Sequence, residues 1–138
     1  MDDPVLLSEI PNRTARARAA EGAPVVVFLN PVEYHGPHLP LDTDTILAEG
    51  ALREAYSVLR GQGLDWPMLV YSKIRVGCGA VPTNGSIRHR YREMKRVVRD
   101  VCDGIRSLGA KRAILMTFHG EPHHNLAIED GVRLLRSR

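Results

Sequence analysis

The sequence contains few of the features that mark secreted, membrane-embedded or nucleic-acid-binding proteins. It has only two cysteines, Cys78 and Cys102, which argues against a disulfide framework and for a reducing compartment. No apolar run approaches the roughly 18 residues that a membrane span requires. The net charge is +3 with both signs spread along the chain, so no nucleic-acid or membrane partner is implied. The first residues, MDDPVLLSEI, lack the charge of a secretory or organellar leader, and we expect a cytoplasmic protein.

The chain also lacks internal repeats, low-complexity linkers and breaks in composition. Its 138 residues suit one compact domain, which we assign to residues 1–138. No glycine-rich loop follows the first predicted strand, and this disfavours a nucleotide-binding function.

Three apolar segments predict the strands of a sheet. They span residues 23–30 (APVVVFLN), 67–74 (PMLVYSKI) and 111–117 (KRAILMT). The first is an uninterrupted β-branched and aromatic run, as expected of a strand that is covered on both faces in a parallel sheet. Trp66, just before the second segment, is expected to be a packing residue.

Helical patterns alternate with these strands. An alanine-rich segment predicts a surface helix over about residues 5–20, favoured chiefly after Pro11. The alternation predicts an α/β protein with a mainly parallel sheet and right-handed crossovers. Apolar residues recur at helical spacing in residues 43–60, 90–108 and 125–135, and glycines end the first two.

The chemistry of the chain is concentrated in EYHGPHLPLDTD, residues 33–44, directly after the first strand. Its carboxylates and imidazoles are the ligands that divalent cations prefer. A second group, HGE at residues 119–121, follows the third strand. Because ligands bind outside the carboxyl ends of neighbouring parallel strands, we expect the two groups to converge. The candidate metal ligands are Glu33, His35, Asp44, His119 and Glu121.

Three carboxylates and two imidazoles carry too much charge to lie together without a cation. They suffice for two divalent ions when one carboxylate bridges them. Two ions a few ångströms apart can hold a water between them, lower its pKa and polarise a carbonyl. This is the chemistry of C–N bond hydrolysis, and we expect a two-metal site.

EYHGPHLPLDTDT resembles the first metal motif of the creatininase (creatinine amidohydrolase) family, and FHGE followed by Asn125 resembles the second. The resemblance runs from about Val25 to the C-terminus. It implies a three-layer α/β/α fold and a cytosolic, commonly hexameric enzyme. It further implies a metal-dependent amidohydrolase, in which a metal-bridging hydroxide attacks a cyclic or linear amide and zinc, manganese or iron is the cofactor.

The resemblance also assigns the ligands to two ions. Glu33 and His119 are implied to hold one ion, His35 and Glu121 the other, and Asp44 to bridge them. Family members are usually longer, so the chain corresponds to their N-terminal half. The alternative is therefore a metal-binding but catalytically silent domain, or a subunit that requires a second chain. A truncated sheet also exposes an apolar edge, which favours a partner chain, self-association into a homo-oligomer or a missing segment.

Some residues allow a second interpretation. Asp44 also suits a helix N-cap, and Asp42 suits a cap or a turn. His38 is expected to orient the loop rather than to bind metal. Glu121 precedes a proline and can also remain in solvent.

Two further features lie near the candidate site in sequence. His123 and His124 are candidates for proton transfer or substrate contact, and we assign Glu121 and His123 as the candidate catalytic residues. The basic segment 88–99 is interpreted as a solvated helix face. Recognition of a carboxylate or phosphate by this segment is the alternative.

Overall fold

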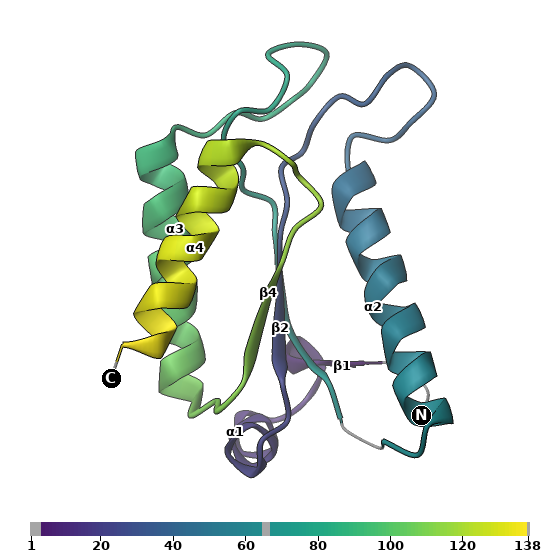
Figure 1. The fold of residues 1–138 in the computed structure, drawn as a ribbon, viewed down its shortest axis with the longest axis vertical. Coiled ribbons are helices and arrows are strands. Elements are labelled where there is room, and N and C mark those ends of the chain that lie inside the picture. Colours follow the sequence, from purple (N-terminus) through teal and green to yellow (C-terminus); the bar gives the residue numbers. More distant parts are fainter. Residues whose placement is uncertain (1–3, 65–66, 138) are drawn as a thin grey trace.

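A parallel sheet lies at the centre of the protein and carries helices on its two faces (Figure 1). The computed structural model describes residues 4–64 and 67–137, so the expected packing residue Trp66 lies outside the described residues. Within those ranges the sheet has four strands, in the order β1-β3-β2-β4, and all are parallel. The strands are β1 (Val5–Leu6), β2 (Val25–Leu29), β3 (Leu69–Ile74) and β4 (Ala113–Met116).

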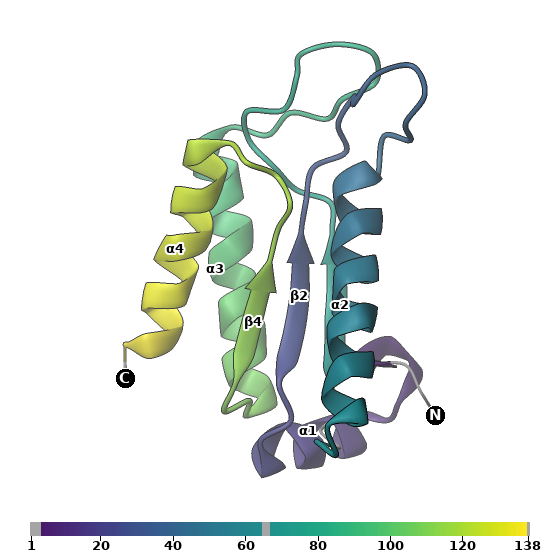
Figure 2. The ribbon, with the colours of Figure 1, turned by 45° about the vertical axis from the view of Figure 1, so that its right-hand side comes forward.

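The helices form the outer two layers. One face of the sheet is covered by α2 and the other by α3 and α4, while α1 lies near the N-terminal ends of the strands (Figures 1 and 2). This confirms the predicted three-layer α/β/α fold. In the described part of the chain, no helix combines the length and apolar character needed to cross a membrane. The helices are α1 (Asn12–Glu21), α2 (Thr43–Gly61), α3 (Tyr91–Leu108) and α4 (Pro122–Arg136), preceded by the 3-10 helix η1 (Leu7–Glu9).

The central strand β2 supplies most contacts between the layers. Its five residues are at most 2% exposed. Alternate side chains point to opposite faces: Val27 and Leu29 pack toward α3 and α4, whereas Val26 and Phe28 pack toward α2. Full burial of a side chain of this size contributes about 1.5–3 kcal/mol. The prediction that this strand is covered on both faces is confirmed.

The N-terminal segment differs from the prediction. We expected one helix over about residues 5–20, but α1 begins at Asn12, and β1 and η1 precede it. Pro11 disfavours helical backbone in the residue before it. The short apolar segment ahead of this proline instead completes the edge of the sheet, where β1 pairs with the start of β3.

The remaining predicted elements are confirmed, with ends that differ by a few residues. The helix α3 ends at Gly109, whose φ of 84° lies in the left-handed region, as expected of a glycine C-cap. The helix α4 begins at Pro122 rather than near residue 125. Proline is favoured in the first turn of a helix, and the side chain of Glu121 caps this turn.

His124 connects the first turn of α4 to the ends of β2 and β4. Its ring is fully buried. The Nε2–H group lies 3.1 Å from the carbonyl oxygen of Leu29 and 3.0 Å from Thr117 Oγ1, while Nδ1 has no hydrogen-bond partner among the described residues. A proton on Nδ1 would be buried without an acceptor. Burial, assisted by nearby His119, accordingly lowers the pKa of His124 to about 4.

The helices α3 and α4 are closely packed at Gly131. A Cβ atom at this position would overlap Val98 and would lie 3.0 Å from the sulfur of Cys102. Both neighbours are buried core residues of α3. Gly131 therefore permits the close packing of these two helices.

We expect Gly131→Ala to lower the free energy of unfolding by about 1–3 kcal/mol, because the added methyl group overpacks the α3–α4 interface. Gly50→Ala is the matched control, since Gly50 lies in α2 with open space around its Cα. That variant should gain up to about 1 kcal/mol from the better helix propensity of alanine. Urea unfolding measures both values, and stabilisation by both substitutions would contradict the close approach.

The buried neutral state of His124 predicts a pH dependence of stability. Its pKa is lowered from 6.5 to about 4 in the folded chain, so the unfolded chain takes up this proton first. The stabilisation is present above pH 6.5 and is lost as the pH falls toward 4. The full loss is about 3 kcal/mol.

Unfolding free energies measured between pH 4.5 and 7.5 with a metal chelator test this prediction. We expect His124→Leu to flatten the decline at acidic pH, although the lost hydrogen bonds lower its stability throughout. His38→Asn changes an exposed histidine and should keep the wild-type slope. A wild-type slope in His124→Leu would show that another group causes the decline.

Candidate metal centre

The two polar groups meet because the strands that precede them are neighbours. β2 pairs with β4 in parallel register, so the loops that follow these strands leave the same edge of the sheet (Figure 1). Glu33 and His35 lie in the loop after β2, His119 lies in the loop after β4, and Asp44 lies in the first turn of α2. These four residues, which we expected to converge together with Glu121, lie in one cluster, and their role as metal ligands stays a prediction.

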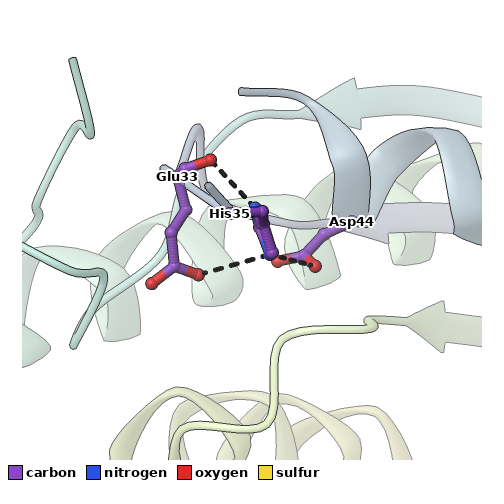
Figure 3. A group of neighbouring side chains, drawn as sticks. All are labelled: Glu33, His35 and Asp44. Atoms are coloured by element: carbon purple, nitrogen blue, oxygen red, sulfur yellow. Dashed lines mark hydrogen bonds and ion pairs between the residues drawn. The ribbon is translucent and has the colours of Figure 1, made fainter. Parts of the chain in front are cut away.

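The four side chains form one cluster. His119 Nδ1 lies 3.0 Å from Glu33 Oε2 and 3.6 Å from Asp44 Oδ2. His35 Nε2 lies 3.1 Å from Asp44 Oδ1 and 3.9 Å from Glu33 Oε2. Figure 3 shows His35 between the two carboxylates, and one ligand atom from each of these three residues lies within 4.8 Å of the others. Glu33, Asp44 and His119 are buried, and His35 is half-buried.

Both imidazoles are oriented by backbone carbonyl groups. His35 Nδ1–H donates to the carbonyl oxygen of Glu33 at 2.9 Å, and His119 Nε2–H donates to the carbonyl oxygen of Cys78 at 3.0 Å. A carbonyl oxygen only accepts, so the proton of each neutral ring lies on its outer nitrogen. The inner nitrogen of each ring then faces the carboxylates. Metal-ligating histidines typically show this arrangement.

The loop after β3 supports the cluster with backbone atoms. The N–H group of Val81 donates to Glu33 Oε1 at 2.7 Å, which leaves Oε2 directed at the histidines. The same loop supplies the Cys78 carbonyl group that orients His119. Residue types alone could not identify this support, because nearly every residue offers the same backbone donor and acceptor.

Asp44 carries the strongest indication that a cation belongs in the cluster. Burial raises the pKa of this carboxyl group, and the neighbouring His35 and His119 act in the opposite direction. Asp44 Oδ2 is buried and accepts no hydrogen bond from the described residues. A buried carboxylate oxygen that accepts no hydrogen bond raises the free energy of the folded protein. A divalent cation between Asp44, Glu33 and the histidines would offset this desolvation cost. The donor set therefore fits a divalent metal ion.

The structure places Glu121 at the N-terminus of α4. Glu121 Oε2 accepts from the N–H of His124 at 2.7 Å, and Oε1 lies 2.9 Å from Nδ1 of the exposed His123. Burial raises the pKa of this carboxyl group, but these hydrogen bonds outweigh it and lower the pKa to about 2. Among the described residues, Glu121 makes no hydrogen bond or ion pair with Glu33, Asp44 or the two metal-facing histidines. Its assignment as a metal ligand stays a prediction.

The two cysteines are free and buried, in agreement with the expectation of no disulfide framework. Cys78 lies beside the cluster, with its sulfur 3.7 Å from Glu121 Oε2. Burial and the nearby Glu121 carboxylate raise the pKa of the Cys78 thiol to about 11. The side chain is therefore a neutral thiol, and its proton is available to Glu121.

Other residues of the first motif have structural contacts. Asp42 stands at the N-cap position of α2, yet its carboxylate makes no capping hydrogen bond. It pairs instead with Arg75, with nitrogen–oxygen distances of 3.0 Å and 2.6 Å. His38 is exposed in the loop. Arg75 was not recognised in the sequence, although a cation directly after a strand is a signal for a carboxylate at the same sheet edge.

Known proteins provide an independent comparison. No curated protein matches the chain. Solved structures that match it at 20–22% identity include a creatininase described as the Mn form (TM-score 0.74), a mutant creatininase of Zn-Zn type (0.76) and a mutant creatininase complexed with creatine (0.77). Each match covers 96% of this chain and 51% of the other.

At this level of identity the three structures establish the fold, and the chain spans about half of their length. The family comparison covers a similar share of this sequence. The model of the creatininase family, described as creatinine amidohydrolase, matches residues 8–138. The match includes both polar groups and every strand except β1. The chain therefore belongs to the creatininase family.

Proposed function

We propose that this protein is a metal-dependent amidohydrolase that hydrolyses a cyclic or linear amide C–N bond. One observation carries the proposal: the carboxylates of Glu33 and Asp44 lie together with two backbone-oriented imidazoles, and the buried Oδ2 of Asp44 accepts no hydrogen bond from the described residues. Zinc, manganese or iron, when bound, would lower the pKa of a water molecule and polarise an amide carbonyl. Creatininases are described with manganese and zinc, which supports these metals here.

The arrangement of Asp44 supports a site for two ions. Its Oδ1 faces His35 and its Oδ2 faces His119, so the carboxylate lies between the two histidines. Glu33 and His119 would hold one ion and His35 the other, with Asp44 shared. Glu121 would complete the second set only after leaving its capping position on α4.

The exposed His123 is the proposed proton donor to the leaving nitrogen. Its Nδ1 lies 2.9 Å from Oε1 of the Glu121 carboxylate, and this contact orients the ring at the N-terminus of α4. Proton transfer requires such a positioned, accessible imidazole. A small amide or lactam is the proposed substrate class, supported by the creatine found with one structurally similar creatininase.

A metal-binding but catalytically silent domain is the second candidate function. It is favoured by the capping role of Glu121 and by the half-length match to the creatininase structures.

The edge strand β4 carries an exposed apolar side chain, Ile114 (41% exposed), and Phe118 (45% exposed) follows shortly after the end of this strand. We propose that a second copy of the chain covers this edge, in a homo-oligomer that is a hexamer if it follows its family. A cytoplasmic location likewise stays a proposal.

We expect His35→Ala to weaken binding of Zn²⁺ or Mn²⁺ by at least about tenfold. Loss of a side chain that only orients a metal ligand already weakens metal binding by about 10- to 100-fold, and this substitution removes a proposed ligand itself. His38→Ala, in the same loop, is the matched control and should retain wild-type affinity. Isothermal titration of the metal-free protein, together with metal analysis of the purified protein, measures both. Equal affinity of the two variants would exclude His35 as a ligand.

We expect the rate of hydrolysis of creatinine, or of another small lactam or linear amide, to fall at least about 100-fold in Asp44→Asn. Loss of a side chain that only orients a metal ligand costs about 10- to 100-fold in activity, and this substitution changes a proposed ligand itself. Asp42→Asn makes the same chemical change two positions away, where the carboxylate pairs with Arg75, and should remain active. Product release is assayed with each metal on size-fractionated protein, which also shows which assembly carries the activity.

The outcomes separate the two candidate functions. Metal binding that depends on His35, without turnover in any fraction or on any substrate of the panel, would favour the silent domain. Turnover that survives Asp44→Asn would place the reaction elsewhere in the protein.

A further inference from the structure

A basic groove lies between α3 and α4, on the outer side of the helical layer. Its volume is about 750 Å³, which lies in the range of small-molecule sites. Tyr91 and Leu134 contribute apolar surface to its lining. Its charged lining is Arg92, Lys95, Arg96 and Arg99 from α3, with Asp130 and Arg133 from α4.

Only part of this positive charge is balanced. Lys95 pairs with Asp130 at 2.6 Å and lies over the ring of Tyr91, and Arg133 pairs with Glu129 at 2.6 Å. Arg92, Arg96 and Arg99 make no ion pair with any described residue. Like charges three and four positions apart destabilise a helix by about 0.2–0.5 kcal/mol per pair. The three arginines therefore repel one another along α3, and an anion between them would relieve this repulsion.

The spacing of the arginines indicates the form of the anion. Arg92 and Arg99 are seven positions apart, which corresponds to about 10 Å along a helix. A single phosphate group could bind all three guanidinium groups only if the side chains converged on it, whereas a chain of two or three phosphates could bind them along that length. Arginine also recognises phosphate through paired, planar hydrogen bonds, which a lysine cannot form.

We propose that the groove between α3 and α4 is an anion-binding site for the di- or triphosphate group of a small molecule. The site is built from side chains of two helices and uses no glycine-rich loop. It is therefore compatible with the absence of a nucleotide-binding motif after β2. The proposal does not depend on the amidohydrolase activity, because none of its residues belongs to the metal cluster.

Isothermal titration of the metal-free protein tests the site. The titration is done at about 0.15 M salt, because exposed charges more than about 8 Å apart are then largely screened. The probes are inorganic tripolyphosphate, pyrophosphate, orthophosphate and citrate. We expect saturable binding of tripolyphosphate at least tenfold tighter than that of orthophosphate or citrate. Arg96→Gln and Arg99→Gln should each weaken it about tenfold, the effect of losing one charged hydrogen bond.

Arg13→Gln on α1 and Arg53→Gln on α2 are the matched controls, because they remove the same charge from exposed positions outside the groove. Tripolyphosphate should also raise the thermal unfolding midpoint of the wild type and of these controls, and should raise that of Arg96→Gln by less at the same concentration. Absence of saturable binding, equal binding of citrate, or an equal loss in the controls would each overturn the proposal.

Discussion

The parallel pairing of β2 with β4 is the constraint on which the site depends. The side chain of Asn30 extends this pairing beyond the last backbone bonds, since its buried Oδ1 accepts from the N–H of Phe118 at 2.9 Å and from the Thr117 hydroxyl at 3.2 Å. The residues before the two polar groups are thus held together by hydrogen bonds that water cannot replace. This pairing sets the distance between His119 and Glu33, and a slip in register would separate them.

Three side chains of the cluster use one polar atom to contact the backbone and direct the other toward the interior of the cluster. Each imidazole and the Glu33 carboxylate gives one atom to a backbone group and directs the other inward. The side chains therefore keep their orientation without a cation, and little conformational entropy remains to be lost on binding. The loop after β3 is as important for this orientation as the ligand loops, although it contributes no ligand to the cluster.

Residue types were sufficient to predict the layers, three of the four strands and the cluster Glu33, His35, Asp44 and His119, because long apolar runs and metal-ligand chemistry are visible in sequence. β1 was missed because two extended residues show no periodicity and acquire a strand conformation only by pairing with β3. The ion pair between Asp42 and Arg75 depends on where two loops meet. Backbone support from Val81 was equally invisible, since every residue except proline offers the same N–H group.

Glu121 shows why residue type alone does not fix a role. The same carboxylate suits a helix cap and a metal site, and in this structure it caps α4. An N-cap contributes about 1 kcal/mol, whereas structural zinc sites in small proteins contribute on the order of 10 kcal/mol. Shared among four ligands, that energy is still larger than the cost of releasing the cap. The observed cap is compatible with a ligand role for Glu121, and the deciding quantity is the geometry of the first turn of α4.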